Sequence, residues 1–145
     1  MKIAYKKLNE RAVAPVYGSK GSAGGDLCSA EESDVIVRAG ETAFIGTGLA
    51  VEIPEGYVGL VYARSGLACK SDLAPANKVG VIDSDYRGEI KVALHNHGKT
   101  DRTVSRGDRI AQLVIAPYLY VEYEEVPELS DTVRGAGGFG STGRK

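Results

Sequence analysis

The 145-residue sequence contains no tryptophan, one methionine, two histidines and two cysteines. Cys28 and Cys69 lack the C-x-x-C spacing of redox and zinc motifs, so we expect both to be small buried residues. No apolar run approaches the roughly 20 residues of a membrane helix, and the N-terminus lacks the apolar segment of a signal peptide. We therefore expect an intracellular protein with no membrane partner, cytoplasmic or, in a eukaryotic or viral setting, nuclear.

An excess of charge of either sign is also missing. The chain has 18 basic and 19 acidic side chains, which gives a formal net charge of -1. No overall field would draw such a protein onto a polyanion, so nucleic acid is not expected as a partner.

What the sequence does contain is a rhythm of short β-branched segments, separated by many of its 19 glycines and five prolines. This rhythm predicts an all-β protein. The expected strands are 34–37, 42–53, 57–62, 79–82, 89–95, 100–104, 109–117 and 118–126, and one short helix is expected over 65–70. Strands in one small domain must protect their edges, which favours a jelly-roll-like β-barrel or sandwich.

The composition changes at Arg134, after which five glycines leave Phe139 as almost the only apolar side chain. We expect residues 1–133 to form the jelly-roll domain and residues 134–145 to be its flexible, glycine-rich C-terminal tail. The tail matches G-x-G-x-x-G, but too few residues follow it for a dinucleotide-binding helix. Its glycines still let backbone N–H groups approach phosphate, beside donors from Arg134, Ser141 and Thr142.

The densest polar cluster is segment 80–89, which the pattern predicts to be a β-hairpin tip. Asp83 and Asp85 either cap their own turn or carry chemistry, and the local sequence does not decide between the two. A calcium loop of the EF-hand type is excluded, because Arg87 and Leu94 stand where oxygen ligands are required.

Two smaller patterns concern anions and metals. Arg64 and Ser65 begin the expected helix, where they would either contact phosphate or provide a simple Ser N-cap. His95 and His97 are two residues apart, but no third ligand is evident nearby, so we expect a surface turn there.

Five segments, taken in order, resemble the five motifs of the trimeric dUTP pyrophosphatase (dUTPase) family. They are 23–27 (AGGDL), 64–68 (RSGLA), 80–88 (GVIDSDYRG), 106–113 (RGDRIAQL) and 134–143 (RGAGGFGSTG). The resemblance covers most of the chain. It implies a jelly-roll homotrimer with shared active sites, which hydrolyses dUTP to dUMP and pyrophosphate with Mg²⁺.

The resemblance also implies residue roles. Asp83 resembles the general base that orients water toward the α-phosphorus, and Asp26 resembles the acid that holds Mg²⁺ through a bound water. The residues that resemble phosphate contacts are Arg64, Ser65, Gly66, Gln112, Arg134, Ser141 and Thr142. Those that resemble the uracil and deoxyribose contacts are Asn77, Gly80, Val81, Ile82, Tyr86 and Phe139.

One departure is Gly25, which stands where the family often has a bulkier residue. Two other functions stay open at this point. One is a dCTP deaminase on the related trimer fold, and the other is a non-catalytic nucleotide-sensing module. The Ile-Asp-Ser-Asp-Tyr form of segment 82–86 argues against the first, and the intact Asp83 and tail argue against the second.

Overall fold

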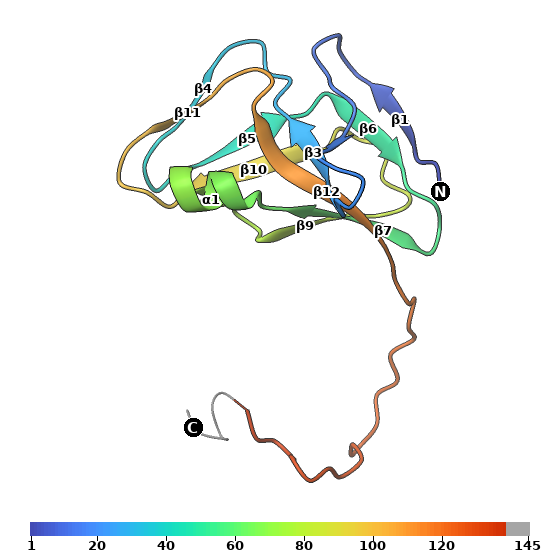
Figure 1. Cartoon of the computed structure of the whole chain (residues 1–145). Coiled ribbons are helices and arrows are strands. Elements are labelled where there is room, and N and C mark those ends of the chain that lie inside the picture. The colour runs from blue at the N-terminus through green and yellow to red at the C-terminus, as the bar shows by residue number, and fades with distance from the viewer. Residues whose placement is uncertain (139–145) are drawn as a thin grey trace.

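The computed structural model describes residues 1–138 as short strands and one short helix (Figure 1). The elements are β1 (Ala4–Lys7), β2 (Val16–Tyr17), β3 (Gly25–Cys28), β4 (Val35–Val37), β5 (Thr42–Gly46), β6 (Leu49–Glu52), β7 (Tyr57–Tyr62), α1 (Ser65–Ser71), β8 (Leu73–Pro75), β9 (Val79–Ile82), β10 (Lys91–Asn96), β11 (Arg102–Val104) and β12 (Arg109–Pro117). No helix among these residues could span a membrane.

The strands form antiparallel sheets around one core. The largest sheet has the order β2-β3-β12-β7-β9, and a second has the order β5-β10-β8. Two smaller pairs, β1-β6 and β11-β4, complete the structure. The predicted all-β jelly-roll sandwich is confirmed.

Alternating side chains explain how the strands form that core. In β10, Val92 and Leu94 are buried while Lys91 and His95 lie on the opposite face. Apolar side chains from both large sheets meet between them, including Leu27, Ile45, Val61, Val92, Leu94, Ile110 and Leu113. Burial of one such leucine or isoleucine contributes about 1.5–3 kcal/mol to folding.

Three expected strands have the predicted bounds, namely β7, β9 and β12. The expected helix is α1, which runs one residue further and ends where Asp72 adopts a left-handed conformation with φ 56°. The expected single strand over 42–53 is wrong, because this segment forms two strands, β5 and β6, separated at Thr47 and Gly48. There the buried Thr47 hydroxyl donates to the Ile90 carbonyl at 2.6 Å, and Gly48 has φ +65°.

Other expectations are corrected. Segment 80–89 is not a hairpin tip, because β9 pairs with β7 while β10 pairs with β5 and β8, so the segment crosses between two sheets. The expected strand over 118–126 is absent, since within residues 1–138 this segment pairs with no strand. Figure 1 shows the chain after β12 running away from the sheets. Cys69 is exposed and Cys28 half-buried, so neither is the buried residue expected.

Candidate active site

The strand β12 brings together residues that are far apart in the sequence. Gln112 lies directly opposite Asp26 of β3 on one side and Tyr62 of β7 on the other. Because Arg64 follows β7 by two residues, its side chain reaches the same end of the sheet. Three of the motif-like segments therefore meet here through strand register.

An irregularity in β12 adds Arg109 to this group. Arg109 lies opposite Cys28 and Ala111 opposite Leu27, so the pairing register shifts by one residue between them. In a regular strand, residues three apart would point to opposite faces. The bulge places the extra residue, Ile110, in the core and leaves Arg109 and Gln112 lining one cavity.

Asp26 is the electrostatic centre of this group. Its Oδ1 atom accepts a hydrogen bond from Arg64 Nε at 2.8 Å, and its Oδ2 atom accepts one from Arg109 Nη1 at 3.2 Å. The Asp26 side chain is only 15% exposed. Burial, and then the neighbouring Asp26 charge, raise the pKa of the Cys28 thiol. Two guanidinium groups facing one carboxylate leave a net positive charge, which suits a polyanionic ligand.

These residues line a cavity of about 490 Å³. It contains Asp26 and all the residues before the tail that we predicted to bind phosphate, namely Arg64, Ser65, Gly66 and Gln112. Gln112 is held by a hydrogen bond from its Nε2 atom to the Ala63 carbonyl at 2.8 Å. A Ser N-cap is not what places Ser65 here, because Arg64 occupies the N-cap position and makes no side-chain capping bond.

A second cavity, of about 570 Å³, lies beside β9. Four of the predicted residues line it, Val81, Ile82, Asp83 and Tyr86, together with Phe44, Glu89 and Lys91. Asn77 and Gly80 lie next to it along the chain, with the Asn77 amide near the Gly80 backbone.

The loop after β9 is held by Tyr86 and Arg87. The Tyr86 hydroxyl donates to the Glu89 carbonyl at 3.0 Å, and Arg87 Nη1 donates to the Ser84 carbonyl at 2.6 Å. Within residues 1–138 the carboxylates of Asp83 and Asp85 accept no hydrogen bond. The turn-capping interpretation is therefore not realised, and the exposed Asp83 carboxylate is available to a ligand or a water.

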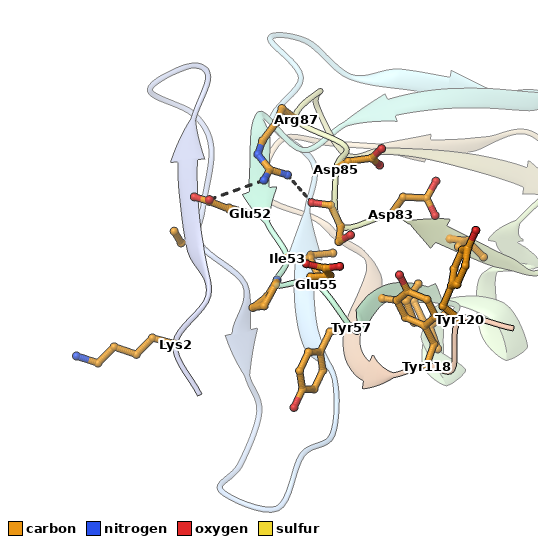
Figure 2. Close-up of a pocket in the computed structure, with 16 residues that line it drawn as sticks. Lys2, Glu52, Ile53, Glu55, Tyr57, Asp83, Asp85, Arg87, Tyr118 and Tyr120 are labelled. Atoms are coloured by element: carbon orange, nitrogen blue, oxygen red, sulfur yellow. Dashed lines mark hydrogen bonds and ion pairs between the residues drawn. The ribbon is translucent and has the colours of Figure 1, made fainter.

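A third cavity, of about 1230 Å³, is larger than these two and adjoins this loop (Figure 2). Asp83 and Val81 line both this cavity and the second one. Tyr118 and Tyr120, at the start of the C-terminal extension, form another part of the wall. Figure 2 shows Arg87 reaching Glu52, with Nη2 and Oε1 3.7 Å apart.

One chain does not bring all predicted residues together. Within residues 1–138, the cavity around Asp26 and the cavity around Tyr86 share no lining residue. Arg134 lies in the C-terminal extension, where its Nε atom donates to the Gly137 carbonyl at 2.7 Å. Phe139, Ser141 and Thr142 lie outside the described residues.

Two residues of this region were missed as functional candidates. Arg109 was part of a motif-like segment but had no assigned role, and its proximity to Asp26 depends on the bulge. Gly88 packs directly against the Tyr86 ring, and a Cβ atom on Gly88 would overlap the phenol group. A similar contact explains the departure at Gly25, whose Cβ would come within 3.0 Å of the Pro15 side chain.

The donor set around Asp26 suits an indirect metal contact. No group of three or more His, Cys, Asp or Glu side chains that could hold a metal occurs within residues 1–138. Mg²⁺ binds few protein carboxylates and keeps several waters when phosphates supply its other ligands. A single carboxylate beside an anion-binding cavity fits that mode of binding.

The fold is a jelly roll, and its cavity around Asp26 sets the guanidinium groups of Arg64 and Arg109 against one carboxylate. The model of the dUTPase family matches residues 10–143. The chain belongs to the dUTPase family.

Named relatives cover essentially the whole chain. The deoxyuridine 5'-triphosphate nucleotidohydrolase of Nautilia profundicola is 55% identical over 144 residues, covering 99% of this chain and all of that protein. The enzyme of the same name from Hydrogenobaculum sp. is 48% identical over 145 residues, covering all of both chains.

Solved dUTPase structures also resemble this chain over most of its length. The dUTPase of Staphylococcus bacteriophage 80alpha with dUPNHPP has a TM-score of 0.86 and 34% identity, covering 98% of both chains. A mutant dUTPase from phage phi11 of S. aureus, described with a coordinated structural Mg(II) ion, has a TM-score of 0.78 and 32% identity. That match covers 88% of this chain and 98% of the phage chain.

Proposed function

We propose that this protein is a dUTP diphosphatase, which hydrolyses dUTP to dUMP and pyrophosphate. The observation that carries the proposal is the meeting of Asp26, Arg64 and Gln112 in one positively charged cavity, in a chain of the dUTPase family. Relatives that match its full length are named deoxyuridine 5'-triphosphate nucleotidohydrolases.

The phosphate chain is assigned to the cavity around Asp26. Arg64 and Gln112 provide N–H donors, and Ser65 and Gly66 provide a hydroxyl and an open backbone. Arg109 adds a second guanidinium group. Phosphoryl transfer depends mainly on positioning and on neutralising charge, and charge-assisted bonds from Arg supply both.

Asp83 is assigned as the general base, which orients a water and accepts its proton as the oxygen attacks the α-phosphorus. Pyrophosphate is the leaving group. The support is that the Asp83 carboxylate is exposed and unpaired within residues 1–138, on the wall between two cavities. A base must have such a free lone pair within reach of the water.

The deoxyuridine is assigned to the cavity beside β9. The Tyr86 ring would pack beneath the sugar and exclude a 2'-hydroxyl by contact, while Asn77 and the Gly80–Ile82 backbone would bind the uracil edge. The anchored Tyr86 hydroxyl supports this role, because it fixes the ring without relying on the ligand.

Mg²⁺ is the proposed cofactor, held by the phosphates and, through a bound water, by Asp26. When bound, the ion supplies charge neutralisation and alignment of the three phosphates. Before the nucleotide binds, the ion pairs of Asp26 with Arg64 and Arg109 hold its carboxylate beside the cavity where the ion would bind.

A homotrimer with shared active sites is proposed as the working form. Its support is the separation of the two sets of residues within one chain, since each cavity would be completed by another copy. Residues after β12 leave the body of the chain, and Tyr120 and Tyr123 in this extension are 92% and 93% exposed. Such aromatic side chains gain by packing on a neighbouring copy.

The segment 134–145 is proposed to be a lid on the jelly-roll domain 1–133. Arg134, Ser141 and Thr142 would contact the outer phosphates, and Phe139 would stack on uracil. Closure of such a segment would exclude bulk water from the reacting groups while the attacking water stays in place.

The decisive experiment is an assay of pyrophosphate release from dUTP, with UTP and dTTP assayed separately as controls. We expect rapid release from dUTP alone. Ammonia release from dCTP is measured in parallel. Ammonia without pyrophosphate would identify a deaminase, and binding of dUTP without either product would identify a nucleotide sensor.

A further inference from the structure

Tyr62, the last residue of β7, belongs to a row of polar side chains that crosses the largest sheet. It lies directly opposite Gln112 of β12, and Gln112 lies directly opposite Asp26 of β3. Residues paired in this way across antiparallel strands point to the same face of the sheet. The three side chains therefore share one face, and all three line the cavity around Asp26.

The alternation of β7 shows that this is the outer face of the sheet. Gly59 and Val61 are buried, whereas Tyr62 is 36% exposed. Val114, two residues beyond Gln112, lines the same cavity and is a diagonal neighbour of Tyr62, within reach of an aromatic ring. The phenol group therefore has an apolar neighbour on the side of the sheet where the cavity opens.

The hydroxyl of Tyr62 is free to bind a ligand. Among residues 1–138 no polar group forms a hydrogen bond with it, although the neighbouring Ala63 carbonyl accepts one from Gln112. A phenol hydroxyl can donate one hydrogen bond and can also accept. The donor capacity of Tyr62 is therefore available inside the cavity.

Gln112 alone offers little to a phosphate chain on this side of the cavity. Its Nε2 atom already donates one N–H group to the Ala63 carbonyl at 2.8 Å, which leaves the other for a ligand. Its Oε1 atom can only accept, and it lies so close to Gly24 that a Cβ atom there would come within 2.7 Å of it. A phosphate chain presents many acceptor oxygens, so a second donor beside Gln112 would find a partner.

We propose that Tyr62 is a further substrate-binding residue, whose hydroxyl donates to an oxygen of the pyrophosphate portion of dUTP. This inference rests on the proposed function, which assigns the phosphate chain to the cavity around Asp26. The pyrophosphate portion carries most of the negative charge of the nucleotide, and the guanidinium groups of Arg64 and Arg109 line the same cavity. The contact is lost when pyrophosphate leaves, so Tyr62 favours the triphosphate over the product dUMP.

The test compares three ligands of the full chain by calorimetry with Mg²⁺: a non-hydrolysable dUTP analogue, inorganic pyrophosphate and dUMP. Tyr62→Phe removes the hydroxyl and keeps the ring. We expect it to weaken binding of the analogue and of pyrophosphate about 10-fold, the order for a hydrogen bond to a charged group, and to change dUMP affinity less than ~2-fold. In turnover of dUTP, KM should rise by the same factor while kcat changes less than ~3-fold, because the contact is made before the transition state as well as in it.

Tyr17→Phe is the matched control, because Tyr17 lies in β2 of the same sheet, is exposed, and does not line the cavity formed by the described residues. It should bind all three ligands as the parent does. Thermal melts followed by circular dichroism verify that both variants are folded. Parental affinity of folded Tyr62→Phe for pyrophosphate, or an equal loss of affinity for dUMP, would overturn the proposal.

Failure of the proposed function gives a different result. A parent chain that binds inorganic pyrophosphate but releases none from dUTP would contradict the proposed function, while the binding data would still decide the role of Tyr62. A parent chain that binds neither pyrophosphate nor the analogue would overturn the proposal for Tyr62 as well.

Discussion

Arg64 donates from Nε to Oδ1 of Asp26 at 2.8 Å, and this bond ties the segment after β7 to β3, across the intervening strand β12. The carboxylate holds the guanidinium group, whose Nη1 atom also donates to the Arg109 carbonyl at 3.4 Å, while the Arg64 side chain lines the cavity. In the proposed site, an acidic residue among phosphate contacts would have two uses, since it orients a cation and would offer an outer contact to a hydrated metal.

Replacement of Asp26 by Asn preserves its shape and removes its charge. We expect Asp26→Asn to raise the Mg²⁺ concentration needed for half-maximal turnover by at least ~10-fold, the order found for loss of an outer-shell contact to a metal. Pyrophosphate release measured over a range of Mg²⁺ concentrations checks this. Asp34→Asn, at an exposed position remote from the cavity, is the control, and an unchanged Mg²⁺ dependence in Asp26→Asn would remove Asp26 from metal binding.

Asp83 and Asp85 provide a matched pair for the general base, because both are exposed carboxylates in one loop. Asp83→Asn should keep dUTP affinity and lower turnover by at least ~100-fold, as expected when a general base is lost. Asp85→Asn should change turnover less than ~3-fold. Single-turnover kinetics and nucleotide binding are measured for both. Near-normal turnover in a folded Asp83→Asn protein would reject the assignment.

Gly88 and Tyr86 test how deoxyribose is selected. Tyr86→Phe loses the bond to the Glu89 carbonyl, a loss of about 1 kcal/mol, but keeps the ring and should still prefer dUTP to UTP. Gly88→Ala displaces the ring and should lower the ratio of kcat/KM values for dUTP and UTP by at least ~10-fold. If Tyr86→Phe accepted both nucleotides equally, the phenol group and not the ring would be the selective element.

Within residues 1–138 the core consists of residues up to Leu113, with Ile115 packed against it, so the C-terminal extension after β12 lies outside it. A chain ending at Ser130 should melt within a few degrees of the full chain and lose most of its turnover. Co-refolding it with Asp83→Asn chains should restore part of the activity, because each chain supplies what the other lacks. Silence of mixed assemblies, isolated with two different affinity tags, would place each site within one chain.

The strands β7, β9 and β12 could be predicted because their apolar residues are continuous and turn residues bound them. The strands β1, β2, β3 and β8 were missed. β1, with Lys6 and Lys7, is entirely exposed. β3 buries Gly25 and Leu27 in alternation, but a glycine at a buried position does not show this alternation in the sequence. Their pairing depends on distant partners, which no local pattern contains.

The residues of the candidate site could be predicted from the sequence, but their arrangement in space could not. The motif-like segments identified Asp26, Arg64 and Gln112, and strand register brings these three together. The expected hairpin was wrong because local turn residues do not reveal that β9 and β10 belong to different sheets. The role of Arg109 was missed because a one-residue shift of register cannot be recognised from residue types alone.

The register shift in β12 restricts insertions and deletions in this part of the chain. Deletion of one residue between Arg109 and Gln112 would straighten β12 and turn one of the two side chains into the core, although every residue type in the site would remain. An insertion would likewise move one of the two side chains to the other face of the strand. The number of residues in this short stretch is therefore as tightly constrained as their identities, and substitutions of Ile110 or Ala111 by apolar residues of similar size should be tolerated far better than gaps.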